Sequence, residues 1–310
     1  MTCSRIHSHQ IYTKMAVQVL PKDLPTLLPV LKKHLPGSQG VFMPISLITR
    51  GLTGYDVYVD RWPDVSAVLV KISEEGLNDT NHEKVTHIYK FEDADDIVLK
   101  NLLDNSGLLN QPIIGIPGAL LNLSVIIKDI LLRKEIFVEE VSNAVPLYCC
   151  TSTTQLPELP KGYSARCLRR EDYDTILTGV WYKDVDYVKS VKRVLALGAL
   201  SVGVEDSSGQ LIAWTLQHVT GLLGMTFVIP EHRNQKLGKY VTVALAQKMI
   251  AQDGFCLAGI EEGNSVSVKL HEEVGFTKMD QPLVFSSFRQ RDLEPDINLK
   301  MPSPSDKGWK

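Results

Sequence analysis

Residues 227–250 pass from a strongly apolar run into a polar, basic turn and then into a helical pattern. Residues 227–229 are apolar, and the turn that follows carries Arg233 and Lys236. From Leu237 onward, apolar residues recur at helical spacing. The pattern predicts a buried strand that leads directly into a helix with a positively charged first turn. A joint of this kind belongs to a sheet covered by helices, and it favours an α/β or α+β fold.

The start of that helix is a candidate anion site. The first backbone N–H groups of a helix have no partner within the helix, and its dipole is positive at this end, so such starts bind pyrophosphate. Arg233, Lys236 and Lys239 add positive charge at the same place. An ordinary solvated helix start carries similar residues. The joint alone therefore leaves both interpretations open.

The second half of the chain reads as a mixed unit over residues 162–290. A turn at Asp206–Gly209 separates two apolar runs and predicts a β-hairpin. The predicted helices cover 170–181, 186–197, 237–250 and 265–273, and the predicted strands cover 199–205, 211–218, 221–229, 255–260 and 275–288. The expected order is two helices, three strands, helix, strand, helix, strand.

The first half, residues 16–150, also mixes both element types. Helical spacing predicts helices over 24–35, 93–103 and 120–132, and apolar runs predict strands over 41–48, 55–59 and 65–72. Between the halves, residues 151–161 contain four Ser/Thr and two Pro in eleven residues, which predicts a linker. We expect residues 1–15 to be an N-terminal extension and 291–310 to be a disordered tail. The length of 310 residues fits two domains.

Composition excludes several classes of protein. A net charge of −3 gives no overall basic field, so nucleic acid is not an expected partner. The five Cys are scattered without zinc spacing, which argues against a metal site and favours a reducing compartment. The longest apolar stretch, 119–132, is too short and too interrupted to span a membrane.

The first 22 residues contain no acidic residue but include Arg5, Lys14 and Lys22. This composition is compatible with a mitochondrial presequence. Met15 is equally compatible with an alternative start. The expected location is therefore mitochondrial or cytoplasmic.

Two motifs in the second half resemble the GNAT acyltransferase superfamily. Residues 233–238 are similar to its R/Q-x-x-G-x-G/A joint, with Lys236 where the first glycine is expected. Asn264 and residues 270–276 are similar to its N-x(5)-L-Y-x-x-x-G-F pattern, with His271 in place of the tyrosine. The resemblance implies an acyl-CoA site in a GNAT-like mixed sheet, with pantetheine along residues 227–229 and near Asn264. The implied binding residues are Phe227, Val228, Ile229, Arg233, Asn234, Gln235, Lys236, Leu237, Gly238, Lys239 and Asn264.

Further motifs resemble the glycine N-acyltransferase family. Residues 59–64, VDRWPD, are similar to its V-D-K/R-W-P-D stretch, and the pair Thr220-Gly221 and Trp181 match as well. The resemblance implies two domains, the first of related architecture. It also implies an acyl-CoA co-substrate without a metal or other cofactor, and glycine or another small amine as acceptor. Residues 59–64 are also expected to fix a turn between strands.

The chain departs from that family at the expected proton acceptor. Leu222 stands where the resemblance implies a glutamate base, and leucine accepts no proton. His218 and Glu261, with its neighbour Glu262, are candidate substitutes, and His271 is a candidate acid for the leaving thiolate. Each of these side chains also fits an ordinary structural or surface role. Two alternatives stay open: a catalytically impaired acyl-CoA binder, and an acetyltransferase of protein lysines or polyamines.

Overall fold

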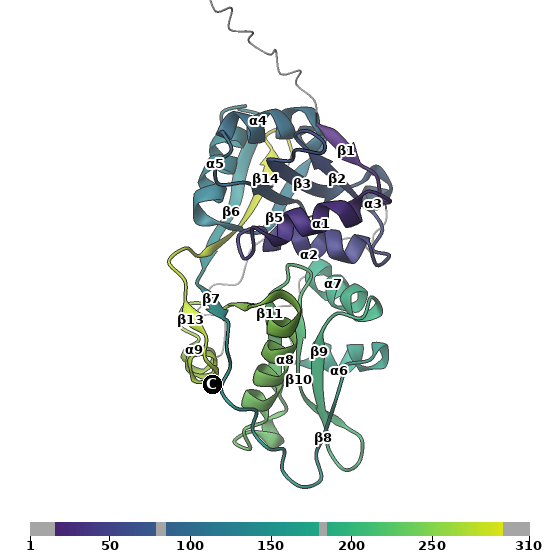
Figure 1. Cartoon of the computed structure of the whole chain (residues 1–310), viewed down its shortest axis with the longest axis vertical. Helices are drawn as coiled ribbons and strands as arrows, with labels where there is room; N and C mark the ends of the chain where they lie inside the picture. Colours follow the sequence, from purple (N-terminus) through teal and green to yellow (C-terminus); the bar gives the residue numbers. More distant parts are fainter. Residues whose placement is uncertain (1–15, 79–84, 180–184, 294–310) are drawn as a thin grey trace, which may run out of the picture.

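The computed structural model describes residues 16–78, 85–179 and 185–293. They form mixed helices and strands in two halves, drawn one above the other in Figure 1. We call β1–β6 with α1–α5 the N-terminal half, and β7–β13 with α6–α9 the C-terminal half. The predicted extension 1–15, Trp181 and residues 294–310 of the predicted tail lie outside the described residues.

The N-terminal half is built on an antiparallel sheet of order β1-β2-β3-β4, which continues through a bridge from Val85 to Gly115 toward β5. Its elements are β1 (Val17–Val19), α1 (Leu24–Lys32), α2 (Gln39–Ile48), β2 (Tyr55–Val59), β3 (Ala67–Ile72), α3 (Glu74–Asn78), β4 (His87–Lys90), α4 (Asp96–Asn105), η1 (Leu108–Asn110), β5 (Ile113–Leu120), α5 (Leu121–Leu132) and β6 (Phe137–Val145).

The C-terminal half is built on a seven-stranded sheet of order β13-β7-β12-β11-β10-β9-β8. Its elements, with the last strand of the chain, are β7 (Leu147–Cys150), β8 (Ser164–Arg166), η2 (Arg170–Asp172), α6 (Tyr173–Thr178), α7 (Val185–Ala196), β9 (Ser201–Glu205), β10 (Leu211–Gln217), β11 (Leu223–Val228), η3 (Pro230–His232), α8 (Leu237–Asp253), β12 (Cys256–Gly259), α9 (Ser265–Val274), β13 (Thr277–Lys278) and β14 (Leu283–Gln290).

Two strands lie in the sheet of the half opposite to their predicted domain. β14 pairs with β5 and β6, so the end of the described chain returns to the N-terminal half, as its yellow strand shows in Figure 1. β7 pairs with β12 and β13 and belongs to the C-terminal sheet. The single last strand predicted over 275–288 is therefore two strands in different sheets. Sheet membership does not follow the predicted boundaries at 150 and 290.

Residues 41–48 form part of helix α2, and the prediction of a strand there is wrong. Seven of the ten α2 residues are buried, because the helix packs against both halves. A helix buried on opposite faces shows a continuous apolar run rather than an amphipathic stripe, and a short run of this kind reads equally well as a buried strand.

The two halves share one apolar cluster. Met43 and Leu47 of α2 pack in it with Trp214 and Leu216 of β10 and with Ile176 of α6. Trp214 is completely buried. Burial of large side chains from both halves contributes about 25 cal/mol for each Å² of apolar surface removed from water, which favours a fixed arrangement of the halves.

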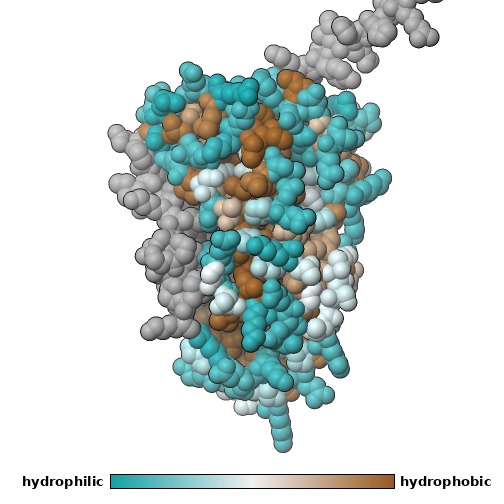
Figure 2. Space-filling view, turned by 90° about the vertical axis from the view of Figure 1, so that its left-hand side faces the viewer, coloured by the Kyte–Doolittle hydropathy of each residue, from teal (hydrophilic) through white to brown (hydrophobic). Residues whose placement is uncertain are grey.

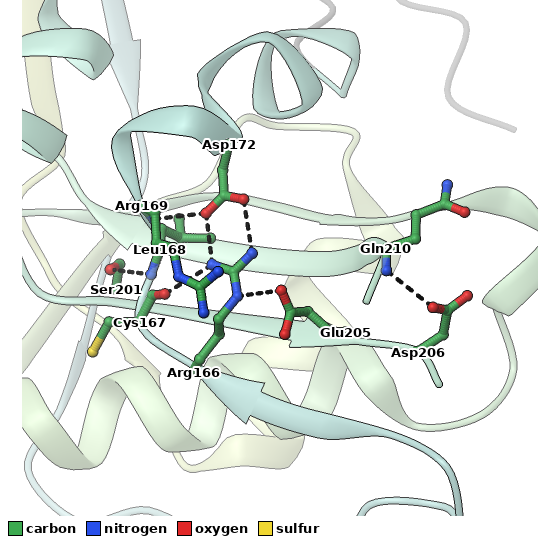
Figure 3. Close-up of polar contacts among 9 residues, drawn as sticks. All are labelled: Arg166, Cys167, Leu168, Arg169, Asp172, Ser201, Glu205, Asp206 and Gln210. Atoms are coloured by element: carbon green, nitrogen blue, oxygen red, sulfur yellow. Dashed lines mark hydrogen bonds and ion pairs between the residues drawn. The ribbon is translucent and has the colours of Figure 1, made fainter. Parts of the chain in front are cut away.

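A partly buried ion-pair cluster lies at the outer edge of the C-terminal sheet (Figure 3). Arg166 of β8 donates to both carboxylate oxygens of Asp172, over 2.6 and 2.8 Å, and its Nε donates to Glu205 of β9. Asp172 also accepts the backbone N–H of Arg169. The hydrogen bonds with Arg166 hold the pKa of the Asp172 carboxyl below its ordinary value, against the opposing effect of burial.

The face shown in Figure 2 is largely hydrophilic, with hydrophobic patches among the polar residues. α5 contributes exposed apolar side chains, because Leu121 and Val125 are 43% and 59% exposed. The other face of α5 packs Leu123 and Ile127 into the core of the N-terminal half. No helix among the described residues has the length and apolar character needed to cross a membrane.

Candidate functional site

Strand β11 lies in the middle of the C-terminal sheet, yet one of its edges is largely open. Among the described residues, it pairs with its parallel neighbour β12 only at Leu223 and Ala258. Residues 224–228 are consequently only half-buried. On the closed edge, the Ile229 N–H donates to the Ile212 carbonyl of β10. Successive N–H groups of a strand point to opposite edges, so the N–H of Val228 points toward the open edge. This edge offers main-chain groups to a ligand.

A bulge interrupts β11 beside that open edge. Met225 has a positive φ of 55°, and the register with β10 shifts between Trp214 and Leu216. The hydroxyl of Thr215 donates to the Gly224 carbonyl at 3.0 Å and lies 2.9 Å from the hydroxyl of Thr226. A bulge of this kind bends the strand and redirects its main-chain groups. Residue 225 is a methionine rather than a glycine, so the sequence did not indicate the bulge.

The turn between β11 and α8 has the backbone of an anion nest. Asn234 and Lys236 adopt left-handed conformations with φ of 62° and 59°. Alternation of backbone conformation in such a turn directs successive N–H groups toward one point. The first hydrogen bond of α8 runs from Tyr240 N–H to the Lys236 carbonyl, and no side chain caps the helix. The preceding N–H groups are available to an anion.

Three basic residues belong to the turn or to the first turn of α8. Arg233 donates from Nε to the Val228 carbonyl over 3.3 Å and lies over the Phe227 ring, 5.8 Å from its centre. Lys236 is exposed. Lys239 lies 3.9 Å from Glu273 of α9, a loose ion pair at the surface. The predicted positive charge is therefore present at the start of α8.

The other predicted binding residues of this segment have different surroundings. Leu237 is buried in the core under the sheet, and Val228 and Ile229 pack against that core, so only their main-chain groups are available for binding. Gln235 accepts a hydrogen bond from the hydroxyl of Tyr163 at 3.0 Å. A Cβ at Gly238 would meet only ordinary contacts, 3.6 Å from Val228 and 3.9 Å from Leu270.

Asn264 caps α9, because its side-chain oxygen accepts the N–H of Ser267 at 3.1 Å. This capping leaves its NH₂ group as a donor. Asn264 and Glu261 follow the C-terminal end of β12, the parallel neighbour of β11. Glu261 is only partly exposed. Both predicted residues thus follow the strand that neighbours the open edge of β11.

His271 lies in the core rather than at an exposed surface. It is 4% exposed, and its ring meets Phe276 edge-on. Nδ1 lies 2.8 Å from the Ser267 carbonyl, an obligate acceptor, so Nδ1 carries the proton. Nε2 is buried without a partner among the described residues. Burial lowers the pKa of His271, so the ring is neutral and Nε2 holds a lone pair, a geometry that gives no support to the predicted acid role.

His218 lies in a tight turn that precedes β11. The backbone N–H of His218 donates to the Leu222 carbonyl, and its backbone carbonyl accepts the N–H of Gly221. In the ring, Nδ1 lies 3.4 Å from the Thr220 hydroxyl. Burial lowers the pKa of His218 to about 4, which keeps the imidazole neutral at physiological pH. The structure thus places His218 beside Leu222.

The N-terminal half contains a comparable strand-to-helix joint between β4 and α4, but its charge is opposite. Residues 91–96 read FEDADD and carry four acidic side chains. The Asp95 carboxylate accepts the N–H of Ile97, so the helix start is already capped. Phosphate would be repelled there. Only the C-terminal half therefore offers an anion site at such a joint within the described chain.

Residues that the sequence analysis did not single out lie next to the His218 turn. Gln39 of α2 donates from Nε2 to the Gly221 carbonyl over 3.4 Å. His87 of β4 lies near His218, and burial together with this neighbour lowers the pKa of His87. No motif indicated them, because their position results from packing of the two halves. No group of three His, Cys, Asp or Glu residues within the described ranges is arranged to hold a metal ion.

Comparisons with known proteins agree with this architecture. Residues 201–284 match the family model described as FR47-like protein. Sequence comparison with curated proteins finds no significant match. The match to that model spans β9 to the start of β14, and so includes the open strand, the nest and α9.

Several solved structures are similar over most of their length. A Drosophila protein has a TM-score of 0.66 at 14% identity, covering 89% of this chain and 98% of its own. A tandem GNAT protein from the clavulanic acid biosynthesis pathway has a TM-score of 0.55 at 12% identity, covering 88% and 97%. A GCN5-related N-acetyltransferase from Sphaerobacter thermophilus has a TM-score of 0.50 at 12% identity, covering 92% and 98%. These likenesses confirm the predicted two-domain α/β fold with a GNAT-like C-terminal half.

Proposed function

We propose that the protein is an acyl-CoA-dependent N-acyltransferase. The observation that carries the proposal is that the open edge of β11 leads directly into the nest at the start of α8. Pantetheine contains two amides and can pair with a strand edge as another strand would. Pyrophosphate suits main-chain N–H groups at a helix start, with Arg233, Lys236 and Lys239 nearby.

We further propose glycine or another small amine as acceptor. Support comes from the resemblance of residues 59–64 and of Thr220-Gly221 to the glycine N-acyltransferase family. In the structure, residues 60–64 form a turn, where Asp60 accepts the N–H groups of Ser66 and Ala67 at 2.7 and 2.8 Å. The expected structural role of that turn is therefore supported, and it supplies no catalytic group.

In the proposed reaction, the amine nitrogen attacks the thioester carbonyl, the C–N bond forms and the C–S bond breaks. The main-chain N–H groups of β11 polarise the carbonyl oxygen. The attacking amine must lose a proton, and His218 is a neutral imidazole in the turn that leads into β11. Glu261 is the other candidate acceptor, through water. The departing thiolate takes its proton from solvent, because the geometry of His271 does not favour donation.

A catalytically impaired acyl-CoA-binding protein is the second candidate function. Leu222 at the glutamate position and the inward position of His271 favour it. Both candidates require the same CoA site, so CoA binding does not separate them.

Release of free thiol from a panel of acyl-CoAs, with glycine and other amino acids as acceptors, separates the two functions. We expect amine-dependent release, and we expect Leu222→Glu to raise kcat by about 10²–10⁴, the contribution of a general base. Leu222→Gln is the matched control, since it has similar size but no basic carboxylate. Thiol release no faster than in buffer, together with intact CoA binding, contradicts the transferase proposal and supports the binder.

A further inference from the structure

Two segments of the N-terminal half, α2 and β4, meet the turn formed by residues 218–222 of the C-terminal half. α2 reaches the turn through Gln39, whose amide nitrogen lies 3.4 Å from the Gly221 carbonyl. β4 contributes His87, whose ring is hydrogen-bonded to the backbone of Gly40. The turn itself contributes His218, closed by its backbone bonds to Gly221 and Leu222.

The contact between α2 and the turn leaves no space at Gly221. A Cβ there would lie 1.9 Å from Gln39 Nε2 and 2.6 Å from Met43 Cγ. Gly221 also has a φ of +82°, a conformation that glycine adopts without strain. The Thr220-Gly221 pair is thus explained by close packing of the N-terminal half against this turn.

One polar atom at this junction is buried without a partner. Gln39 is 5% exposed, and its Oε1 has no hydrogen-bond partner among the described residues. Buried polar atoms in native proteins are nearly always hydrogen-bonded, because an unmet acceptor costs free energy. Oε1 accepts only N–H or O–H groups, so its natural partner is a donor from outside the described residues.

The two histidines at the junction can also accept hydrogen bonds. His87 is 4% exposed, and burial, together with the nearby His218, lowers its pKa to about 3. Both imidazoles are therefore neutral at physiological pH, and each neutral ring has one nitrogen that accepts. Gln39 and His87 together favour a ligand that donates N–H groups.

We propose that the amine acceptor binds at this junction, where Gln39 and His87 of the N-terminal half receive its N–H groups beside His218. The turn leads within one residue into β11, so an amine held here lies next to the strand edge assigned to the thioester arm. Gln39 and His87 are then specificity-determining residues of the acceptor site. This inference rests on the proposed acyl transfer.

Steady-state kinetics of Gln39→Leu and Gln111→Leu test the inference. Both glutamines belong to the N-terminal half, both are 5% exposed, and each donates to one backbone carbonyl, but Gln111 bonds Ile72 rather than the turn. We expect Gln39→Leu to raise the KM for the amine roughly tenfold and to leave the KM for acyl-CoA within about twofold, as expected for loss of one substrate hydrogen bond. Gln111→Leu should change neither constant.

His87→Phe is the second variant, because phenylalanine keeps a flat ring and removes both nitrogens. It should also raise the KM for the amine while the Kd for CoA, measured by isothermal titration, stays at the wild-type value. An unchanged KM for the amine in both Gln39→Leu and His87→Phe, or an equal rise for amine and acyl-CoA, overturns the inference while leaving the proposed function intact. Absence of CoA binding or of transfer in the wild type overturns the proposed function itself.

Discussion

At the scale of single residues, the conformation of Lys236 connects the sequence motif with the site. The motif that residues 233–238 resemble has a glycine at this position, and the φ of 59° explains why, since a left-handed residue with a Cβ is strained. The sequence showed that the glycine is missing, but the φ angle is a property of the folded turn. The half-exposed edge of β11 was likewise unpredictable, because Phe227, Val228 and Ile229 suit a core strand and a binding strand equally well.

Lys236→Gly and Lys236→Ala both remove the charge, but only glycine removes the strain. We expect the glycine variant to exceed the alanine variant by about 1 kcal/mol in free energy of unfolding. Urea denaturation of the two variants measures this difference. Equal stability of the two would show that the turn does not hold residue 236 in a left-handed conformation.

At the scale of elements, the sequence predicted those with a regular surface pattern, but not the helix that is buried on opposite faces. The helix from Leu237 extends to Asp253, where Gly254 ends it with a φ of +89°. The predicted hairpin turn is present, with Asp206 accepting the N–H groups of Ser208 and Gln210. α2 was misassigned because it is buried on opposite faces. The Arg166 cluster had no sequence signal at all, because its partners meet only after β8 and β9 have paired.

Asp172→Asn tests how strongly that cluster holds β8 and η2. The side chains of Arg166 and Asp172 are only 15% and 10% exposed, so their bonds are little weakened by water. Loss of the carboxylate charge should lower the free energy of unfolding by about 2–3 kcal/mol. Asp174→Asn, an exposed change in the neighbouring helix, should stay within about 0.5 kcal/mol. A similar small effect for both variants in thermal melts would contradict a stabilising cluster.

At the scale of the whole molecule, β7 and β14 each lie in the sheet of the half opposite to their predicted domain. β14 is the central strand between β5 and β6, and β7 lies between β12 and β13. The sequence predicted two domains from the chain length and from the linker at 151–161. It gave no sign of the exchange, because strand pairing between distant segments depends on tertiary contacts rather than on local pattern.

Two fragments of the C-terminal half test the exchange. A fragment of residues 151–310 lacks β7 and exposes the edge of β12, whereas 146–310 retains β7. We expect the longer fragment to be more soluble and more resistant to proteolysis, because an unpaired inner edge promotes aggregation. Equal behaviour of the two fragments, measured by sedimentation and limited proteolysis, would show that β7 is dispensable to this sheet.

The buried histidines at the junction predict a pH dependence of stability. Their pKa values, about 3 for His87 and about 4 for His218, lie below the ordinary value of 6.5. Below pH 6.5 the unfolded chain therefore binds protons that the folded chain does not, and stability falls as the pH drops toward 4. His87→Phe should flatten this slope by about 1.4 kcal/mol per pH unit, the effect of one proton. Urea unfolding between pH 7.5 and 4.5 measures it, and an unchanged slope would argue against a neutral buried His87.

Calorimetric titration with CoA tests the central claim, the binding of its phosphates at the start of α8, most directly. The wild type should bind CoA. Gly238→Trp should not bind it, because a bulky side chain in the first turn of α8 obstructs access to the N–H groups there. Ala251→Trp, at the exposed far end of the same helix, should bind CoA like the wild type. Failure of the wild type to bind millimolar CoA, or equal binding by Gly238→Trp, would contradict the account.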